Sequence, residues 1–274
     1  DFGTVGKEFQ DLSGLAHLCP PPQGAPLVAW LQTVIAAQTA TRSAGMLPFQ
    51  KAVEAGIELI RAVGTTHVGD ITNSGASIGP LLDSGLAGVV YLEVFGLHPA
   101  DSLPRLQKAK EKINSYRRRE NKMRVGLSVH APYSCHLDLF RDGAAWCVAE
   151  DVPLCVHVAE SPAELELLTH GTGDFRGMQK ALNLPNMPIP GCSPIAYLES
   201  LGVLAAKPLL VHCVQVTDDD IQRLARSGST VAHCPRSNQL LQCGRMPLEK
   251  FLAANIPVCL GTDSLASSPS LDVR

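Results

Sequence analysis

Two histidines and an aspartate in this sequence follow apolar runs, and these residue types bind divalent metals. His157 and His212 lie at the carboxyl ends of two such runs, and Asp263 follows a third. Two imidazoles and a carboxylate suit zinc or a similar divalent ion and leave one coordination position for water. We therefore predict that His157, His212 and Asp263 hold one divalent metal ion, with zinc preferred and iron or manganese as alternatives.

Glu160 follows His157 by three residues and has the chemistry of a proton carrier. A metal lowers the pKa of bound water from about 16 to roughly 7. A nearby carboxylate that is not itself a ligand can then pass a proton to a leaving group. The sequence thus predicts a hydrolytic reaction with Glu160 as a catalytic residue.

Three further polar residues are candidates for substrate binding. His130 ends an apolar run and precedes Ser134 by four residues, so it faces the substrate or is a turn histidine capped by that serine. Glu93 interrupts a strand that otherwise looks buried and must be paired or face a pocket. Ser264 directly follows Asp263. We assign His130, Glu93 and Ser264 to substrate binding.

Another group of hydrogen-bonding side chains follows the strand that ends at His233. It contains Arg236, Ser237 and Asn238. Groups that orient ligands and catalytic residues are needed around any metal site. We expect these three to shape the loop or support neighbouring groups rather than react.

The elements that must position these residues alternate between strand and helix. Strands with continuous apolar runs are buried on both faces, as in a parallel sheet covered by helices, and their carboxyl ends meet at one rim. The predicted strands are Thr65–Ile71, Gly88–Phe95, Arg124–His130, Pro153–Val158, Pro208–Cys213, Thr230–His233 and Val258–Thr262. The predicted helices are Leu27–Ala40, Leu47–Val63, Leu103–Arg118, Leu137–Glu150, Asp218–Ser227 and Pro247–Ala254.

This alternation predicts a (β/α)8 barrel, with an eighth strand before Gly3 and an open doubly wound sheet as the alternative. The segment from Gly171 to Pro194 contains several prolines and is predicted to be a loop over the same rim. No glycine-rich nucleotide-binding motif follows any predicted strand, which disfavours dinucleotide and nucleoside triphosphate binding.

The bulk properties fit an enzyme domain. With 274 residues and 45% hydrophobic content the chain can bury a sizeable core, and we expect residues 1–274 to form a single barrel domain. A net charge of −3 gives no basic field, so nucleic acid is not an expected partner. No apolar segment reaches the roughly 20 residues that span a bilayer. We expect a cytoplasmic protein with a small-molecule substrate; the oligomeric state stays open, a homo-oligomer included.

Several segments occur in an order that resembles the amidohydrolase superfamily, and within it the cytosine deaminase and chlorohydrolase branch. They are Gly64–Thr66, Ser128–Ser134, His157–Ser161, Val211–His212, His233–Asn238 and Leu260–Ser267. The resemblance implies that His157 binds metal, that His212 binds metal or orients the attacking water, and that Asp263 binds metal and accepts the proton of the water. It also implies that Glu160 donates this proton onward and that His130 contacts the substrate.

The sequence departs from this family at its first strand. That strand normally ends in His-x-His and supplies two further ligands, whereas the matching region, Asp1–Lys7, contains no histidine. Fewer ligands weaken metal binding. The family's barrel also continues into a closing helix and a small β-sandwich formed from both ends of the chain. We therefore expect a barrel that is incomplete at both ends.

The expected function is hydrolysis of a C–N bond other than a peptide bond, with deamination of an amino-substituted heterocycle by metal-activated water as the leading reaction. One alternative is a non-catalytic barrel that has lost its metal site and acts as a binding protein. Another is an amidase or chlorohydrolase with the same metal chemistry, which differs only in the leaving group. Likeness of fold does not fix the substrate.

Overall fold

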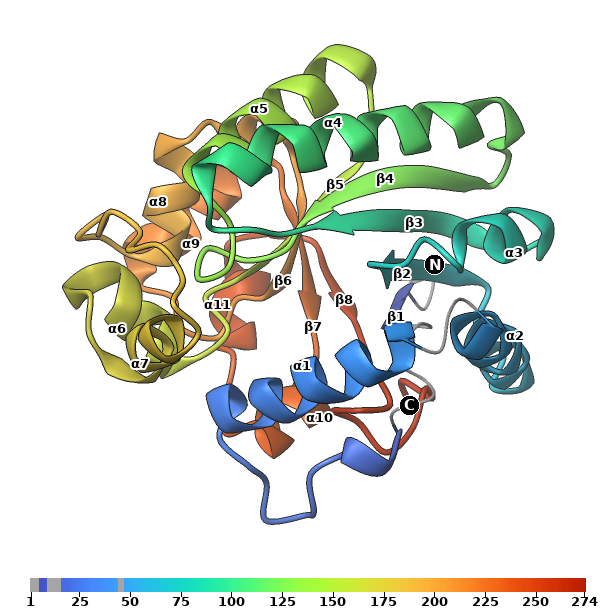
Figure 1. The fold of residues 1–274 in the computed structure, drawn as a ribbon, viewed down its shortest axis with the longest axis horizontal. Helices are drawn as coiled ribbons and strands as arrows, with labels where there is room; N and C mark the ends of the chain where they lie inside the picture. The colour runs from blue at the N-terminus through green and yellow to red at the C-terminus, as the bar shows by residue number, and fades with distance from the viewer. Residues whose placement is uncertain (1–4, 9–15, 44–46) are drawn as a thin grey trace.

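Eight parallel strands form one sheet in the order of the chain (Figure 1). The computed structural model describes residues 5–8, 16–43 and 47–274. The strands are β1 (Val5–Glu8), β2 (His67–Thr72), β3 (Ala87–Val94), β4 (Met123–Val129), β5 (Leu154–Val158), β6 (Leu209–His212), β7 (Thr230–His233) and β8 (Val258–Leu260). Among the described residues β1 and β8 lie near each other without a hydrogen-bonded ladder, so the sheet curls into an incompletely closed barrel.

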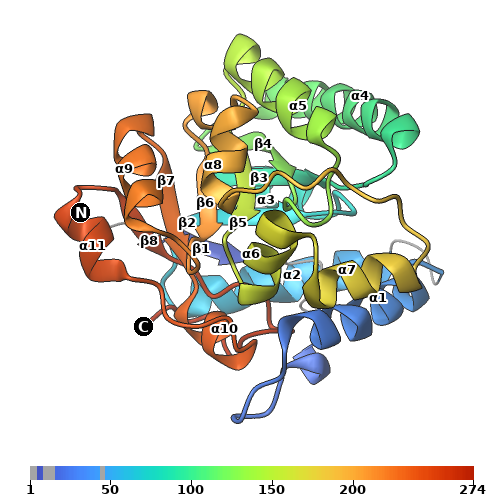
Figure 2. The same ribbon diagram turned by 90° about the vertical axis from the view of Figure 1, so that its left-hand side faces the viewer.

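Helices connect these strands. They are α1 (Leu27–Ser43), α2 (Leu47–Ala62), α3 (Ile78–Asp83), α4 (Pro99–Tyr116), α5 (Leu137–Glu150), α6 (Pro162–His170), α7 (Gly173–Ala181), α8 (Pro194–Ser200), α9 (Asp218–Ser227), α10 (Pro235–Leu240) and α11 (Leu248–Ala253). The helices α4 and α5, for example, cover the outside of the sheet, whereas α1 and α7 lie side by side (Figures 1 and 2). The connections also contain short 3-10 helices, among them Arg117–Arg119 and Val203–Ala206. No helix in the described part of the chain has the length and apolar content needed to cross a membrane.

Two apolar layers hold the barrel together. The outer layer lies between strands and helices and includes Val90, Leu127 and Phe140. The inner layer fills the barrel with side chains such as Tyr91 and Cys155, which alternate along their strands with residues of the outer layer. Burial on both faces explains why the strands read as continuous apolar runs.

The prediction of a (β/α)8 barrel is confirmed. All seven predicted strands occur with ends within two residues of the prediction, and α5 and α9 have the predicted bounds. The eighth strand, predicted before Gly3, lies outside the described residues, and the structure has β1 at Val5–Glu8 instead.

The prediction of a loop from Gly171 to Pro194 was wrong for the first part of this segment, because Gly173–Ala181 forms the helix α7. Phe175, Met178 and Gln179 lie on one side of this helix and are buried. This spacing is that of one face of a helix. Phe175 and Met178 on this face pack into an apolar cluster, and the prolines lie beyond the end of α7.

The close approach of β2 and β3 depends on Gly88. Its φ is +129°, and a Cβ atom at this position would run into the backbone carbonyl of Val68 in the neighbouring strand. We expect Gly88→Ala to lower the free energy of unfolding by about 2–4 kcal/mol, because strain and overpacking add. Gly177→Ala is the matched control, since Gly177 lies within α7 with nothing within 4 Å of its added Cβ. Urea unfolding should show the control to be neutral or stabilised by up to about 1 kcal/mol. Equal stability of the two variants would contradict this role of Gly88.

Candidate active site

All the predicted site residues line one pocket of about 190 Å³ at the carboxyl ends of the strands. They are Glu93, His130, His157, Glu160, His212, Asp263 and Ser264. Strand alternation explains two of these positions. Glu93 follows Tyr91 by two residues, and His157 follows Cys155 by two residues, so both continue the inward-facing rows of the barrel interior.

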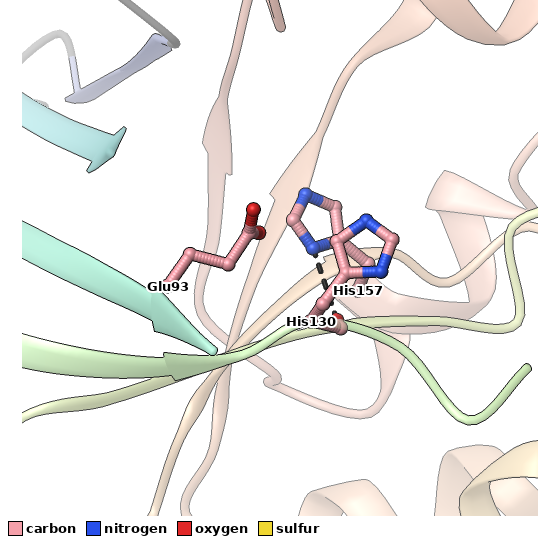
Figure 3. Close-up of side chains that lie close together, drawn as sticks. All are labelled: Glu93, His130 and His157. Atoms are coloured by element: carbon pink, nitrogen blue, oxygen red, sulfur yellow. Dashed lines mark hydrogen bonds between the residues drawn. The ribbon is translucent and has the colours of Figure 1, made fainter. Parts of the chain in front are cut away.

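Glu93, His130 and His157 form the first of two clusters in the pocket (Figure 3). Each offers one potential ligand atom, and these atoms lie within 4.8 Å of one another. The His157 Nδ1 atom lies 3.1 Å from the carbonyl oxygen of His130, and the two rings are 5.0 Å apart. The same carbonyl accepts the backbone N–H of His157 at 2.8 Å, which ties β5 to the end of β4.

Glu160, His212 and Asp263 form the second cluster, and all three are buried. Their potential ligand atoms also lie within 4.8 Å of one another. Glu160 Oε1 is 3.4 Å from His212 Nε2. The His212 ring stacks on the ring of His157, with centroids 5.7 Å apart. The three predicted metal ligands therefore share one pocket but divide between its two adjacent clusters.

Hydrogen bonds from α10 and from the loop after β8 orient the second cluster. Asn238 Oδ1 lies 2.8 Å from His212 Nδ1, which leaves Nε2 as the nitrogen directed at Glu160. Ser237 Oγ donates to Asp263 Oδ2 at 2.7 Å, and Ser267 Oγ donates to the same oxygen at 3.1 Å. Ser237 and Asn238 thus lie in the supporting positions expected from the sequence, whereas Arg236 donates instead to the carbonyl of Arg274.

These contacts fit a divalent metal by the chemistry of their donors. A metal-binding histidine usually engages its second ring nitrogen in a hydrogen bond, as the Nδ1 atoms of His157 and His212 do here. Imidazole nitrogens and carboxylate oxygens are ligands of zinc and similar ions. The region Asp1–Lys7, where the family's His-x-His is expected, is described from Val5 on, in β1, and contains no histidine.

The backbone is strained where the site residues leave their strands. Ala159, His212, Cys213 and Asp263 have φ values of 53°, 76°, 47° and 62°, in the left-handed region that residues other than glycine rarely adopt. Such conformations persist where surrounding contacts enforce them and often occur at functional sites.

The outer side of the pocket is apolar and was not predicted from the sequence. It includes Trp30 and Val34 of α1 together with Met178 of α7. Figure 2 shows α7 alongside α1, and the two helices are in contact. The indole nitrogen of Trp30 donates to the carbonyl of Ala266 at 2.9 Å, which fixes α1 beside the loop that carries Asp263. The apolar spacing along α1 was visible in the sequence, but it equally fits a helix that packs only on the core.

Tyr133 joins this apolar side to the histidines. Its ring stacks on Phe175 with centroids 4.0 Å apart and meets His130 edge to face at 5.6 Å. Burial raises the pKa of the Tyr133 hydroxyl well above its usual value, and the nearby charge of Glu160 raises it further. The hydroxyl is therefore protonated at neutral pH.

The chain is similar to known proteins over most of its length. The profile of the Amidohydrolase family matches residues 16–273. The aminodeoxyfutalosine deaminase of Deinococcus radiodurans is 36% identical over 92% of this chain and 61% of its own length. The 5-methylthioadenosine/S-adenosylhomocysteine deaminase of Thermococcus kodakarensis is 31% identical over 90% of this chain and 54% of its own length.

Among solved structures, an adenosine deaminase from Xanthomonas campestris with bound zinc superimposes with a TM-score of 0.81. It is 22% identical and is matched over 98% of this chain and 57% of its own. The chain thus spans about three-fifths of the length of the curated relatives or less. The ordered motifs, the barrel and the family match lead to one conclusion: this chain belongs to the amidohydrolase family.

Proposed function

We propose that this chain carries the hydrolytic centre of a metal-dependent deaminase that removes an amino group from a heterocycle. The buried cluster of Glu160, His212 and Asp263 carries the proposal, because it joins a proton carrier to metal-binding groups at the base of a pocket. The names of the two curated relatives, both deaminases, support the same reaction. We propose that residues 1–274 act as one barrel domain on a small-molecule substrate.

His157, His212 and Asp263 are the residues we propose to hold one divalent ion. The zinc in the Xanthomonas structure supports zinc as this ion. When bound, such an ion would make water acidic enough to attack near neutral pH. The hydrogen bonds of Asn238 to His212 and of Ser237 to Asp263 would hold the ligands in place before the ion arrives.

The protein groups would then move the protons. Asp263 accepts a proton from the attacking water, and His212 holds the water against the ring carbon that carries the amino group. Of the two protons of the water, Glu160 delivers one to the ring nitrogen. It then passes the proton taken up by Asp263 to the departing amine, so that the C–N bond breaks, ammonia leaves and the ring carbon keeps the oxygen. Its distance of 3.4 Å from His212 supports this role.

The lining of the pocket indicates the kind of substrate. Glu93, His130 and Ser264 present polar groups near the proposed reacting centre, and we propose that they bind the heterocycle or an attached sugar. The apolar side formed by Trp30, Val34 and Met178 suits an uncharged substituent at the other end of the molecule. Together with the names of the relatives, this favours an aminopurine nucleoside with an apolar substituent.

Ammonia release tests the proposal. The zinc-loaded protein is incubated with 5'-methylthioadenosine, adenosine, guanine and cytosine, and ammonia is measured. We expect release from the adenine nucleosides, fastest for the one with the apolar substituent, and none after chelation of the metal. No ammonia from any of the four compounds, with metal bound, would contradict deamination of this substrate class.

A second candidate is a binding protein that has kept the pocket without turnover. The absence of histidine from the region matched to His-x-His favours it. Saturable binding of 5'-methylthioadenosine to the zinc-treated protein, without ammonia release, would support this function and exclude the first.

A further inference from the structure

Glu164 is a fully buried carboxylate next to the site that the proposed chemistry does not use. It is 0% exposed and lies in the first turn of α6. Its Oε1 accepts the backbone N–H of Ala159 at 3.0 Å, and its Oε2 accepts the backbone N–H of Glu160 at 2.8 Å. Both oxygens therefore bind the segment that carries the proposed proton carrier.

This arrangement differs from ordinary helix capping. In a capping box the third residue of a helix accepts the N–H of the cap residue itself, as Asp220 accepts that of Thr217 at the start of α9. In α6 the cap residue, Ser161, accepts the N–H of Glu164 at 3.3 Å, but Glu164 reaches past it to the two preceding residues. The carboxylate thus holds the loop rather than only the end of the helix.

The loop that it holds has a strained turn at Ala159, with a φ of 53°. The carbonyl oxygen of Ala159 accepts the N–H groups of both Val214 and Gln215 at 2.8 Å. The same peptide segment is therefore fixed from two sides, by Glu164 and by the loop that follows His212. This is the segment that places Glu160 Oε1 3.4 Å from His212 Nε2.

The chemistry of Glu164 suits this role. Burial raises the pKa of its carboxyl to about 7, and the two backbone hydrogen bonds oppose the rise. The ionised form accepts these hydrogen bonds more strongly than the protonated form, and the positive end of the α6 dipole favours the ionised form, so both effects oppose the cost of burial. Without this acceptor, two backbone N–H groups next to the site would lose their partners, which is costly in a buried environment.

We propose that Glu164 is a positioning residue that acts through Glu160, by holding its backbone so that its carboxylate stays against His212. This inference rests on the proposed function of Glu160 as the proton carrier. In this role Glu164 contacts neither the substrate nor the metal.

A double-mutant cycle tests the proposal. Glu164→Gln keeps the length of the side chain but replaces one acceptor by an NH₂ group. We expect kcat to fall by about tenfold to a hundredfold, because misplacement of a reacting group has costs of this size. KM should stay within about twofold and metal content should not change, because substrate binding and the ligands are untouched. In a Glu160→Gln background the same substitution should cost less than about twofold, since two residues that act as one unit are not additive.

Glu166→Gln is the matched control, because Glu166 lies on the same helix but is exposed, and it should not change kcat. An equal fold-loss from Glu164→Gln in both backgrounds would show a general structural role and overturn the proposal. Glu164→Asp, which keeps the charge but shortens the reach, should lower kcat in the same way. Failure of both Glu164 variants to fold would also overturn it, because Glu164 would then serve the fold as a whole.

Amide hydrogen exchange separates this inference from the proposed function. The N–H groups of Ala159 and Glu160 should exchange faster in Glu164→Gln, while amides in β5 stay protected. This result would hold even if the wild-type protein released no ammonia, in which case the proposed function alone would fail. Unchanged exchange of both amides would refute the positioning role whatever the activity.

Discussion

Replacing Glu160 by glutamine will lower turnover by about a hundredfold or more while leaving the metal content unchanged. Glutamine has nearly the same shape, so the pocket and the contact with His212 can persist. Its amide neither takes up nor releases a proton near neutral pH, so the ring nitrogen and the departing amine lose their proton donor. Steady-state ammonia release and plasma mass spectrometry of the same samples measure the two effects.

The control for this variant is Glu166→Gln, which changes an exposed glutamate on the adjoining helix in the same way. Turnover of Glu160→Gln equal to that of the control would remove Glu160 from the mechanism. A loss of metal together with activity would instead make Glu160 a ligand, which its position beside His212 and Asp263 allows.

Replacing Asp263 by alanine will lower both the bound metal and the activity. Asp263 is buried, and its Oδ2 accepts hydrogen bonds from Ser237 and Ser267, so its carboxylate is held in one orientation. Loss of a ligand and of its orienting contacts typically lowers metal affinity by about tenfold to a hundredfold or more. A metal titration followed by activity measurement at each step gives both quantities.

Asp219→Ala is a suitable comparison, because Asp219 is an exposed acid in the first turn of α9. It should load metal and turn over as the wild type does. Normal metal loading in Asp263→Ala would contradict the assignment of Asp263 as a ligand.

The barrel could be predicted from the sequence because its strands are buried on both faces and end in polar residues. The runs before His157 and His212 needed no long-range information, since composition alone marks a parallel strand. The first part of the segment from Gly171 to Pro194 was missed because the prolines that follow hide the buried side of α7. Its helical conformation depends on contacts of Phe175 with distant residues such as Tyr133.

The sequence brought together residues that line one pocket, but not the way in which they group within it. Strand register decides this, because Val158 pairs with His212 and His157 pairs with Val211. His157 therefore lies one residue deeper than His212 and meets the end of β4, where His130 is. A period-2 pattern gives the face of a strand but not its offset from its neighbour.

The supporting contacts of the site are the part that the sequence conceals most. Glu164 looks like an ordinary acid in the first turn of a helix, and only the fold shows that it binds the backbone of Glu160. Asn238 was expected to play a supporting role, but its partner, His212, is 26 residues away and follows only from the neighbouring positions of β6 and β7.

Metal stoichiometry measured together with turnover tests the hydrolytic centre most directly. The protein is stripped with a chelator, titrated with zinc, and assayed at each step for bound metal by plasma mass spectrometry and for ammonia release from 5'-methylthioadenosine. We expect one equivalent of zinc to bind and turnover to rise in proportion to its occupancy. A site that stays empty after zinc addition, or ammonia release that does not follow zinc, would contradict a metal-dependent deaminase built on His157, His212 and Asp263.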